Sequence, residues 1–543
     1  MRPEMNHMTL REKLGQTGMP SPNAVKKAIA KYGGYVPFFK ALPYCGLYVD
    51  MGCKNRSDGT QYETPEQLAQ LFDAVNRQLD IPLLISGDFE YGVNTMFPQL
   101  HAASTNMAMG AANSDELAYK RSYYWAREMR SIGVNWPFSP VVDLHTNFFA
   151  TGGIRRLSAD AQVAAKLTGP IIRGIQDAGV AASAKHFPGS SKDYRDTHFC
   201  TNINTKTMEE WNANDRKVWQ AAIDAGVMSI MTAHCAMPAM DDSFARGRIP
   251  RPASASKKAL DILRKEMGYE GLIVTDAVSM KGLAAAFTHE DVYIECFNAG
   301  NDIILFCDVD YIDVMEKAVL DGKVSMERVD DACRRVLELK EKLGLFDFSK
   351  PASPLCANEN ADFEKTCYEI AAKGMTLVCN QDKLLPFDPG KVKKAAIIAV
   401  SPDATFHTSL QVMKDAFATY GIETTILERL SGKQQLRELD ETCDIIIYAC
   451  FLAQSRPLGM SVYARKEELY TLFHSLSFGA DKSVGVSFGA PSIYYNYFEN
   501  VDAFINAYSP DEQTMRAFVD GILGKFPFNE TSPVPLTPEF KDQ

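Results

Sequence analysis

The sequence predicts an α/β protein, in which a large N-terminal (β/α)8 barrel of the TIM type precedes a smaller α/β domain with a mainly parallel sheet. Three observations support this prediction. The chain has 543 residues, more than the roughly 250–300 at which a single hydrophobic core stops growing. Up to about residue 345, short and nearly continuous apolar runs alternate with helical patterns, as in parallel sheets covered by helices. A polar, proline-containing stretch then precedes a second alternation of strands and helices.

Seven apolar segments of the first region are predicted strands. They are residues 46–50, 82–88, 134–143, 180–186, 228–234, 271–276 and 302–307. Helical patterns lie between them, for example at 115–132 and 256–267. Seven recognisable β/α units over about 300 residues favour an eight-stranded barrel with one poorly marked strand. A doubly wound open sheet is the competing architecture.

The end of the first region is marked by a helix and a linker. Ser325 is a predicted N-cap, and the apolar stripe that follows it closes the region. We therefore expect a catalytic barrel domain over 1–345, a linker over 346–361 and a second domain over 362–543. The predicted strands of the second domain are 394–400, 444–451, 483–489 and 503–508.

Composition and charge exclude several classes of protein. With 57 Lys and Arg against 68 Asp and Glu, the net charge is -11, so we expect neither nucleic acid nor an anionic membrane as a partner. No apolar run approaches the ~18–20 residues of a membrane helix, and residues 1–16 lack the apolar core of a signal peptide. The 12 scattered cysteines are typical of free thiols in a reducing compartment. We expect a soluble cytoplasmic protein, of unknown oligomeric state.

Polar residues end five successive apolar strands. Taken singly, such a carboxylate is usually a helix cap and such a histidine a hydrogen-bonded core residue. In a barrel, however, the C-terminal ends of the strands meet at one mouth, where active sites lie. The sequence therefore predicts a shared polar site formed by Asp88, Asp143, Lys185, His186, His234 and Asp276.

Asp276 is flanked by apolar residues on both sides. A carboxylate in such a place is costly unless neighbouring charges compensate it, and Lys185 and Arg155 are candidates for that role. An ionised and partly dry carboxylate is a good nucleophile toward a carbon that bears positive charge. A purely structural ion pair between Asp276 and Lys185 explains the pattern equally well.

Asp196 and His198 lie two residues apart in a polar loop. In an extended segment both side chains fall on one side, so the aspartate can bind the imidazole. Such a bond fixes the tautomer of the ring and raises its pKa, as a general acid/base near neutral pH requires. Pro188 and Gly189 allow the preceding loop to bend or move.

At these residues the sequence resembles glycoside hydrolase family 3, specifically its β-N-acetylglucosaminidase branch. The resemblance rests on the loop from Lys-His-Phe-Pro-Gly at 185–189 to Asp-Thr-His at 196–198 and on Thr-Asp-Ala-Val-Ser-Met at 275–280. Weaker matches are 231–234, 87–92, 155–160 and 368–385. The chain departs from the family pattern at Ser190 and Ser191, which replace a His-Gly pair. Val93 and Met96 stand in a stretch where the family often has arginines.

The resemblance implies a retaining β-N-acetylglucosaminidase that removes terminal β-linked N-acetylhexosamine from glycans or peptidoglycan fragments. It implies that Asp276 is the nucleophile, which forms a covalent glycosyl-aspartate, and that His198, with Asp196 as its partner, is the acid/base. The implied sugar-binding positions are Asp88, Arg155, Lys185 and His186, to which we add His234. The implied partner is a carbohydrate, with no metal and no cofactor.

Four alternatives stay open. A phosphorylase on the same scaffold is compatible with a histidine acid/base, because a histidine that has given up its proton is neutral and does not repel phosphate. A β-glucosidase of the same family is a second alternative. A metal-dependent barrel hydrolase would use His186, His198, His234 and Asp276. A sugar-binding protein without catalysis ranks last, because both predicted catalytic groups are present.

Overall fold

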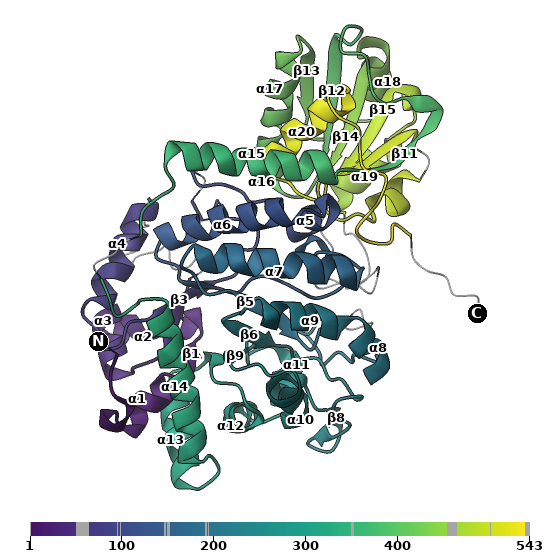
Figure 1. Cartoon of the computed structure of the whole chain (residues 1–543). Coiled ribbons are helices and arrows are strands. Elements are labelled where there is room, and N and C mark those ends of the chain that lie inside the picture. Colours follow the sequence, from purple (N-terminus) through teal and green to yellow (C-terminus); the bar gives the residue numbers. More distant parts are fainter. Residues whose placement is uncertain are drawn as a thin grey trace. The chain divides into compact units, whose positions relative to one another are not determined.

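The structure is a computed structural model, in which helices and strands alternate along the chain (Figure 1). It describes all residues except 1, 50–63, 95, 98, 146, 147, 149–152, 190–192, 194, 349–351, 453–463, 500 and 538–543. The chain forms two compact units. Unit 1 is Met1–His101, Ser122–Asp143 and Thr168–Asn360, and unit 2 is Ala102–Arg121, Leu144–Leu167 and Ala361–Gln543. Unit 2 thus includes two stretches of the N-terminal half, whereas the predicted domains are continuous; the boundaries at 345 and 362 stay a prediction.

Unit 1 contains eight short strands that pair in parallel. They are β1 (Gly18–Pro20), β2 (Gly46–Tyr48), β3 (Leu84–Gly87), β4 (Trp136–Pro137), β5 (Ser183–Phe187), β6 (Ser229–Thr232), β9 (Leu272–Thr275) and β10 (Ile304–Cys307). The ladders run β2-β3-β4, β5-β6-β9 and β1-β10. Single contacts link the ladders: bridges Val141–Lys185 and Val274–Ile303, and a hydrogen bond from Cys45 N to Gly18 O. Each strand therefore has a neighbour on both sides.

The predicted strands agree with seven of these eight. Each predicted segment contains an observed strand or, for β5, overlaps all but its last residue. Asp88 and Asp276 directly follow β3 and β9, and His234 lies two residues after β6. Lys185 and His186 lie inside β5, and Asp143 lies six residues after β4. The strand that the sequence marks poorly is β1. Its three residues, Gly18–Pro20, stand between polar residues, Gln16 and Thr17 before them and Ser21 after them, so no apolar run marks the strand.

Helices follow most of these strands. In unit 1 they include α1 (Leu10–Gly15), α2 (Pro22–Tyr32), α3 (Tyr35–Ala41), α4 (Pro65–Asn76), α8 (Met208–Ala213), α9 (Asp215–Asp224), α10 (Lys257–Asp261), α11 (Lys281–Ala284), α12 (His289–Ala299), α13 (Tyr311–Leu320) and α14 (Met326–Lys342). Helices α6 (Asp115–Ser131) and α7 (Ala161–Asp177) contribute residues to both units. Ser325 caps α14 by accepting a hydrogen bond from the Arg328 amide, as predicted. The remaining strands of unit 1, β7 (Phe244–Ala245) and β8 (Ile249–Pro250), form a small antiparallel pair.

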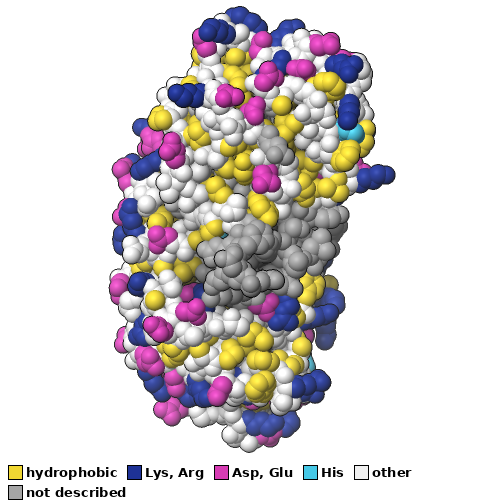
Figure 2. Space-filling view, turned by 90° about the vertical axis from the view of Figure 1, so that its right-hand side faces the viewer, with side chains coloured by type: hydrophobic (Ala, Val, Ile, Leu, Met, Phe, Trp, Pro, Cys, Tyr) yellow, Lys and Arg dark blue, Asp and Glu magenta, His cyan; other side chains and the backbone are white. Residues whose placement is uncertain are grey.

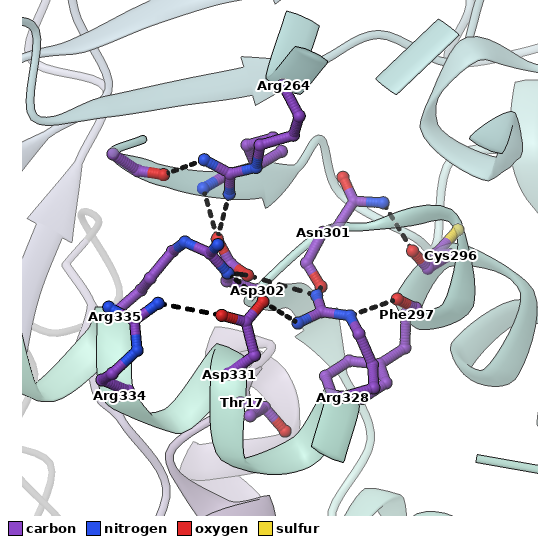
Figure 3. A network of polar contacts seen from close by, with 12 residues as sticks. Thr17, Arg264, Cys296, Phe297, Asn301, Asp302, Arg328, Asp331, Arg334 and Arg335 are labelled. Carbon is purple, nitrogen blue, oxygen red and sulfur yellow. Dashed lines mark hydrogen bonds and ion pairs between the residues drawn. The ribbon is translucent and has the colours of Figure 1, made fainter. Parts of the chain in front are cut away.

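A buried carboxylate, Asp302, ties α14 to the beginning of β9 (Figure 3). Arg264 lies 2.7 Å from one carboxylate oxygen, and Arg328 and Arg335 lie 3.2 and 3.3 Å from the other. The amide of Ile273, in β9, also donates to Asp302, at 3.0 Å. An unpaired buried charge is strongly destabilising, so Asp302 is expected to keep all of these contacts. They hold the beginning of β9, whose other end leads into the candidate site.

Unit 2 contains a six-stranded sheet in the order β11-β16-β15-β14-β12-β13. Its strands are β11 (Thr376–Asn380), β12 (Lys394–Val400), β13 (Glu423–Leu427), β14 (Ile445–Cys450), β15 (Ser483–Ser487) and β16 (Ala503–Asn506). All pair in parallel except β11, which is antiparallel to β16. Ile397 and Ile398, neighbours in β12, belong to two different hydrophobic clusters. Both faces of the sheet are therefore covered, which explains the continuous apolar runs of its central strands.

The helices of unit 2 are α5 (Asn106–Ala112), α16 (Ala404–Ser409), α17 (Gln411–Thr419), α18 (Lys433–Thr442), α19 (Lys466–His474), α20 (Glu512–Ile522) and most of α15 (Ala357–Gly374). The start of α15 lies inside the predicted linker, so the last five residues of that linker are helical. Among the described helices, none combines the length and apolar character needed to cross a bilayer. Acidic and basic side chains are intermingled on the face shown in Figure 2.

Candidate active site

Lys185 lies in β5 and organises the carboxylates that follow β3. Its side chain is 2% exposed, and its Nζ lies 2.5 Å from Oδ1 of Asp88 and 2.8 Å from Oε1 of Glu90. Such a buried ammonium group requires close acidic partners. Lys185 thus pairs with Asp88 and Glu90 rather than with Asp276, so the structural ion pair that the sequence left open is not the one formed. Asp88 itself stays 49% exposed, so its carboxylate is accessible from outside.

Tyr48, the last residue of β2, holds the other oxygen of Asp88. Its hydroxyl donates a hydrogen bond of 2.8 Å to Oδ2. The ring of Tyr48 stacks on Phe138 at 5.9 Å and meets Phe306 edge-on at 4.9 Å. Both oxygens of Asp88 are therefore oriented by fixed groups. Sequence reasoning missed Tyr48, because a tyrosine at the end of an apolar run has no distinguishing pattern.

His186, the next residue of β5, is oriented by Asp143. The His186 Nδ1 lies 2.8 Å from Oδ2 of Asp143, and the His186 amide donates to Oδ1 at 3.2 Å. With Nδ1–H donating to the carboxylate, a neutral ring has Nε2 as its acceptor. The structure thus gives His186 a defined tautomer at the predicted sugar-binding position.

Two buried tryptophans support the loop that follows β5. The indole Nε1–H groups of Trp211 in α8 and Trp219 in α9 both donate to the carbonyl of Pro188, at 2.8 and 3.0 Å. Both rings also meet Phe187 edge-on. The predicted bend at Pro188 is therefore held by two donors, and neither tryptophan carried a sequence signal beyond its place on an apolar helix face.

Asp276 directly follows β9 and is partly buried. Its amide donates to the Thr232 carbonyl at 3.0 Å, and its Oδ1 accepts a 2.7 Å hydrogen bond from the amide of Ala277. Burial raises the pKa of Asp276, but His186, His234, the Ala277 amide and Lys185 together outweigh it, so the pKa is below its usual range. The carboxylate is therefore ionised at neutral pH, and Oδ2 is the oxygen left for an external partner.

His234 contacts the backbone next to this carboxylate and is buried. Burial lowers the pKa of His234, and His186 and His198 lower it further. The charge of Asp276 and the Ala277 carbonyl raise this pKa, but they do not outweigh burial. The ring is therefore neutral. Its Nε2 lies 3.0 Å from the carbonyl oxygen of Ala277 and its Nδ1 2.8 Å from Ser254 Oγ, so Nε2–H donates and Nδ1 accepts. A direct contact of His234 with a sugar would require one of these bonds to break; its present contacts hold the Asp276 segment.

Asp196 and His198 form the hydrogen bond that their spacing predicts. Nδ1 of His198 lies 2.6 Å from Oδ1 of Asp196, and the His198 amide donates to the same oxygen at 2.9 Å. The Asp196 side chain is 7% exposed and that of His198 42%. The carboxylate therefore fixes the ring with Nδ1–H toward the protein and leaves Nε2 to exchange a proton.

The described residues of unit 1 bring these groups into one electrostatic cluster. Asp276 raises the pKa of His234, and His186 and His198 lower it, while His186, His234 and Lys185 lower the pKa of Asp276. Arg155 belongs to unit 2, where it ends a short 3-10 turn (Gly153–Arg155) and its carbonyl accepts a hydrogen bond from Asn106. Its sugar-binding role stays a prediction.

A metal site is not among the arrangements seen. Within the described part of the chain, no three His, Cys, Asp or Glu side chains gather as metal ligands. His234, one of the residues that a metal-dependent mechanism would use, already engages both ring nitrogens. The arrangement instead combines an ionised carboxylate, Asp276, an imidazole held by an aspartate, His198, and a separate exposed carboxylate, Asp88.

Comparison with known proteins identifies the class of protein to which this chain belongs. The family described as "Glycosyl hydrolase family 3 N terminal domain" matches residues 9–339, which is more than half of the chain. The class that the fold and the site define is therefore the glycoside hydrolases. The chain belongs to glycosyl hydrolase family 3.

Relatives of known name agree with this assignment. The chain is 30% identical over 487 residues to a "Beta-N-acetylglucosaminidase/beta-glucosidase" of Cellulomonas fimi, and the matched region covers 84% of each chain. It is 32% identical over 256 residues to a "Beta-hexosaminidase" of Nitrosomonas eutropha, which covers 45% of this chain and 71% of that one.

Solved structures show the same fold. A chain titled "Beta-glucoside phosphorylase BglX bound to 2FGlc" matches with a TM-score of 0.82 at 23% identity, over 98% of this chain and 95% of the other. A family 3 β-N-acetylglucosaminidase from a Paenibacillus species matches with a TM-score of 0.78 at 24% identity, over 98% of this chain and 100% of the other.

Proposed function

We propose that the protein is a retaining β-N-acetylglucosaminidase that removes terminal β-linked N-acetylhexosamine from glycans or peptidoglycan fragments. The observation that carries the proposal is that Asp276 and His198 both act on the buried His234 and so belong to one cluster. Asp276 is kept ionised, while His198 has one nitrogen fixed by Asp196 and one left for proton transfer. Retaining hydrolysis needs a nucleophile and a proton donor; here an Asp–His pair takes the place of the usual second carboxyl group.

In the first step, Oδ2 of Asp276 attacks the anomeric carbon while His198 gives its Nε2 proton to the glycosidic oxygen. The bond from carbon to the leaving group breaks, and a bond from carbon to Asp276 forms. In the second step, His198 takes a proton from water, which attacks the same carbon and releases the sugar from Asp276. The Ala277 amide stays on Oδ1 throughout and orients the carboxylate.

The sugar is held by the groups at the neighbouring strand ends. Asp88, fixed by Lys185 and Tyr48, accepts hydrogen bonds from ring hydroxyls, and Lys185 and His186 complete this side of the site. Arg155 is assigned to the sugar as well, on the resemblance of 155–160 to the family pattern. The names of the Cellulomonas fimi and Nitrosomonas eutropha relatives support a 2-acetamido sugar.

The proposal includes the architecture and location of the protein. The eight parallel strands of unit 1, each with neighbours on both sides, support a closed TIM-type barrel with the site at the C-terminal ends of its strands. The cysteines in the described part of the chain are free, which supports a reducing compartment such as the cytoplasm.

A phosphorylase is the second candidate, and the imidazole acid/base favours it. Once His198 has given its proton away it is neutral, so it does not repel an incoming phosphate as a carboxylate would. Aryl β-N-acetylglucosaminide and aryl β-glucoside, each with and without phosphate, test both candidates. The proposal expects fast turnover of the 2-acetamido substrate to the free sugar, independent of phosphate. Sugar 1-phosphate as the main product would establish the phosphorylase, and a preference for the glucoside would establish a β-glucosidase.

A further inference from the structure

The segment that carries the acid/base histidine is bound to the first turn of helix α11. We call this set of hydrogen bonds the docking contact. It runs from Lys281 N to His198 O (3.2 Å), from Gly282 N to Thr197 O (2.9 Å) and from Thr201 Oγ1 to Gly282 O (2.7 Å).

The docking contact supplies hydrogen-bond acceptors for the first backbone amides of α11. The first amides of a helix have no acceptor within the helix, and the N-cap residue, Met280, supplies no side-chain acceptor. The carbonyls of Thr197 and His198 take that place for two of these amides. Separation of the segment from the helix would leave both amides without their partners, so the helix and the segment stabilise each other.

Gly282 is required by this close approach. A Cβ atom at position 282 would lie 2.6 Å from the carbonyl oxygen of Thr197 and 3.0 Å from that of Cys200. Gly282 does not have a positive φ, so its backbone conformation is open to any residue. Alanine is also the better helix former. The substitution Gly282→Ala should therefore push the segment away while leaving α11 intact.

The other side of the docking contact leads to the nucleophile. The amide of Asp276 donates a hydrogen bond to the carbonyl of Thr232, the last residue of β6. The amide of Val278 donates to the carbonyl of Leu305 in β10, and both bonds are 3.0 Å long. Residues 276–280 are thus held on two strands and lead directly into α11. The docking contact consequently ties the acid/base segment to the same short element that carries Asp276.

We propose that Gly282 and Thr201 are positioning residues that hold the Asp196–His198 pair in place relative to Asp276. The inference rests on the proposed function, since neither residue is given chemistry of its own. Loss of the docking contact would misplace the proton donor and leave the nucleophile in position. Such a change harms substrates that need protonation of their leaving group far more than those that do not.

The test uses Gly282→Ala and Thr201→Val, with two matched controls. Thr201→Ser keeps the hydroxyl group. Gly169→Ala changes a glycine of α7 whose added Cβ would lie 3.1 Å from the flexible end of Arg173 and in ordinary contact with the Cβ of Ala225, at 3.9 Å. Each variant is assayed on two aryl β-N-acetylglucosaminides, one with an activated nitrophenyl leaving group and one with an unactivated phenyl leaving group.

We expect kcat/KM for the unactivated substrate to fall at least about tenfold in Gly282→Ala and Thr201→Val, and that for the activated substrate to fall less than about threefold. Both controls should stay within about twofold of the wild type on both substrates. Equal losses on the two substrates, or no loss, would overturn the proposal.

Hydrogen exchange supplies a readout that does not depend on activity. In Gly282→Ala and Thr201→Val, the amides of residues 281 and 282 should exchange faster than in Gly169→Ala, while those of β9 stay protected. Unchanged exchange at 281 and 282 would refute the docking contact. If the wild-type protein turned over neither substrate, the proposed function would fail, and the exchange result would still decide on the docking contact.

Discussion

The hydroxyl group of Tyr48 donates a hydrogen bond of 2.8 Å to Oδ2 of Asp88, whose Oδ1 is paired with Lys185. An exposed carboxylate is thus held from two sides by groups of other strands. This fixed orientation suits recognition of hydroxyl groups, because it removes the cost of ordering the side chain when a ligand binds.

Removal of this bond should weaken substrate binding. In Tyr48→Phe the ring keeps its packing against Phe138 and Phe306, and the donor to Asp88 is lost. We expect KM to rise about three- to tenfold with little change in kcat, as for a hydrogen bond to a charged group made in both ground and transition states. Steady-state kinetics on an aryl β-N-acetylglucosaminide measure this.

Tyr420→Phe is the matched control for that substitution. It removes a similar tyrosine–aspartate hydrogen bond, 2.7 Å long, to Asp520 in unit 2. Kinetics of this variant should equal those of the wild type. An equal rise in KM in both variants would mean that the effect of Tyr48→Phe is not specific to Asp88.

Loss of the imidazole should depend on the leaving group. In His198→Ala, turnover of substrates with poor leaving groups should fall by about 100-fold or more, whereas activated aryl substrates lose much less. His289→Ala removes another exposed histidine paired with an aspartate, Asp310, and should change neither rate. The ratio of kcat/KM for the two substrates gives the result, and an unchanged ratio in His198→Ala would exclude the acid role.

Replacement of the Asp276 carboxylate by an amide should abolish most of the activity. Asp276→Asn keeps the shape of the side chain and can still accept from the Ala277 amide, so folding should be retained. We expect turnover to fall by about a thousandfold or more, because the amide oxygen is a poor nucleophile. A rate near that of the wild type, at unchanged circular dichroism, would show that the nucleophile lies elsewhere.

Acid should destabilise unit 2 through His145. Burial, together with the nearby charge of Arg156, lowers the pKa of His145 from 6.5 to about 3. Because the folded form binds its proton only near pH 3 and the unfolded form near pH 6.5, the free energy of unfolding falls as the pH drops through this window. The slope of Tm against pH between 6.5 and 4 should be smaller in His145→Gln than in the wild type. Equal slopes would contradict the burial of a neutral imidazole.

The sequence predicts the strands well where both faces are buried. Residues 394–400 were predicted and form β12, because a continuous apolar run is what a doubly covered strand requires. The strands β1, β11 and β13 were not predicted. The first is flanked by polar residues on both sides, and the other two lie at the edges of the sheet of unit 2 and include exposed or half-buried positions.

The candidate site was predictable where its partners are close in sequence. Asp196 and His198 are two residues apart, and the hydrogen bond expected between them is present. The partners of Lys185 lie almost a hundred residues upstream, so the sequence could not distinguish Asp88 and Glu90 from Asp276. The assignment of 102–121 and 144–167 to unit 2 depends on contacts across far larger separations, such as the hydrogen bonds from Thr105 to the Tyr508 carbonyl and from Ser158 to the Pro533 carbonyl, and left no pattern in the chain.

Capture of the covalent intermediate tests the central claim most directly. A fluorinated N-acetylglucosaminide that forms the glycosyl-enzyme quickly and hydrolyses slowly should label the protein once, and digestion followed by mass spectrometry should place the sugar on Asp276. A label on any other residue, or product released with inverted configuration at the anomeric carbon, would contradict the account.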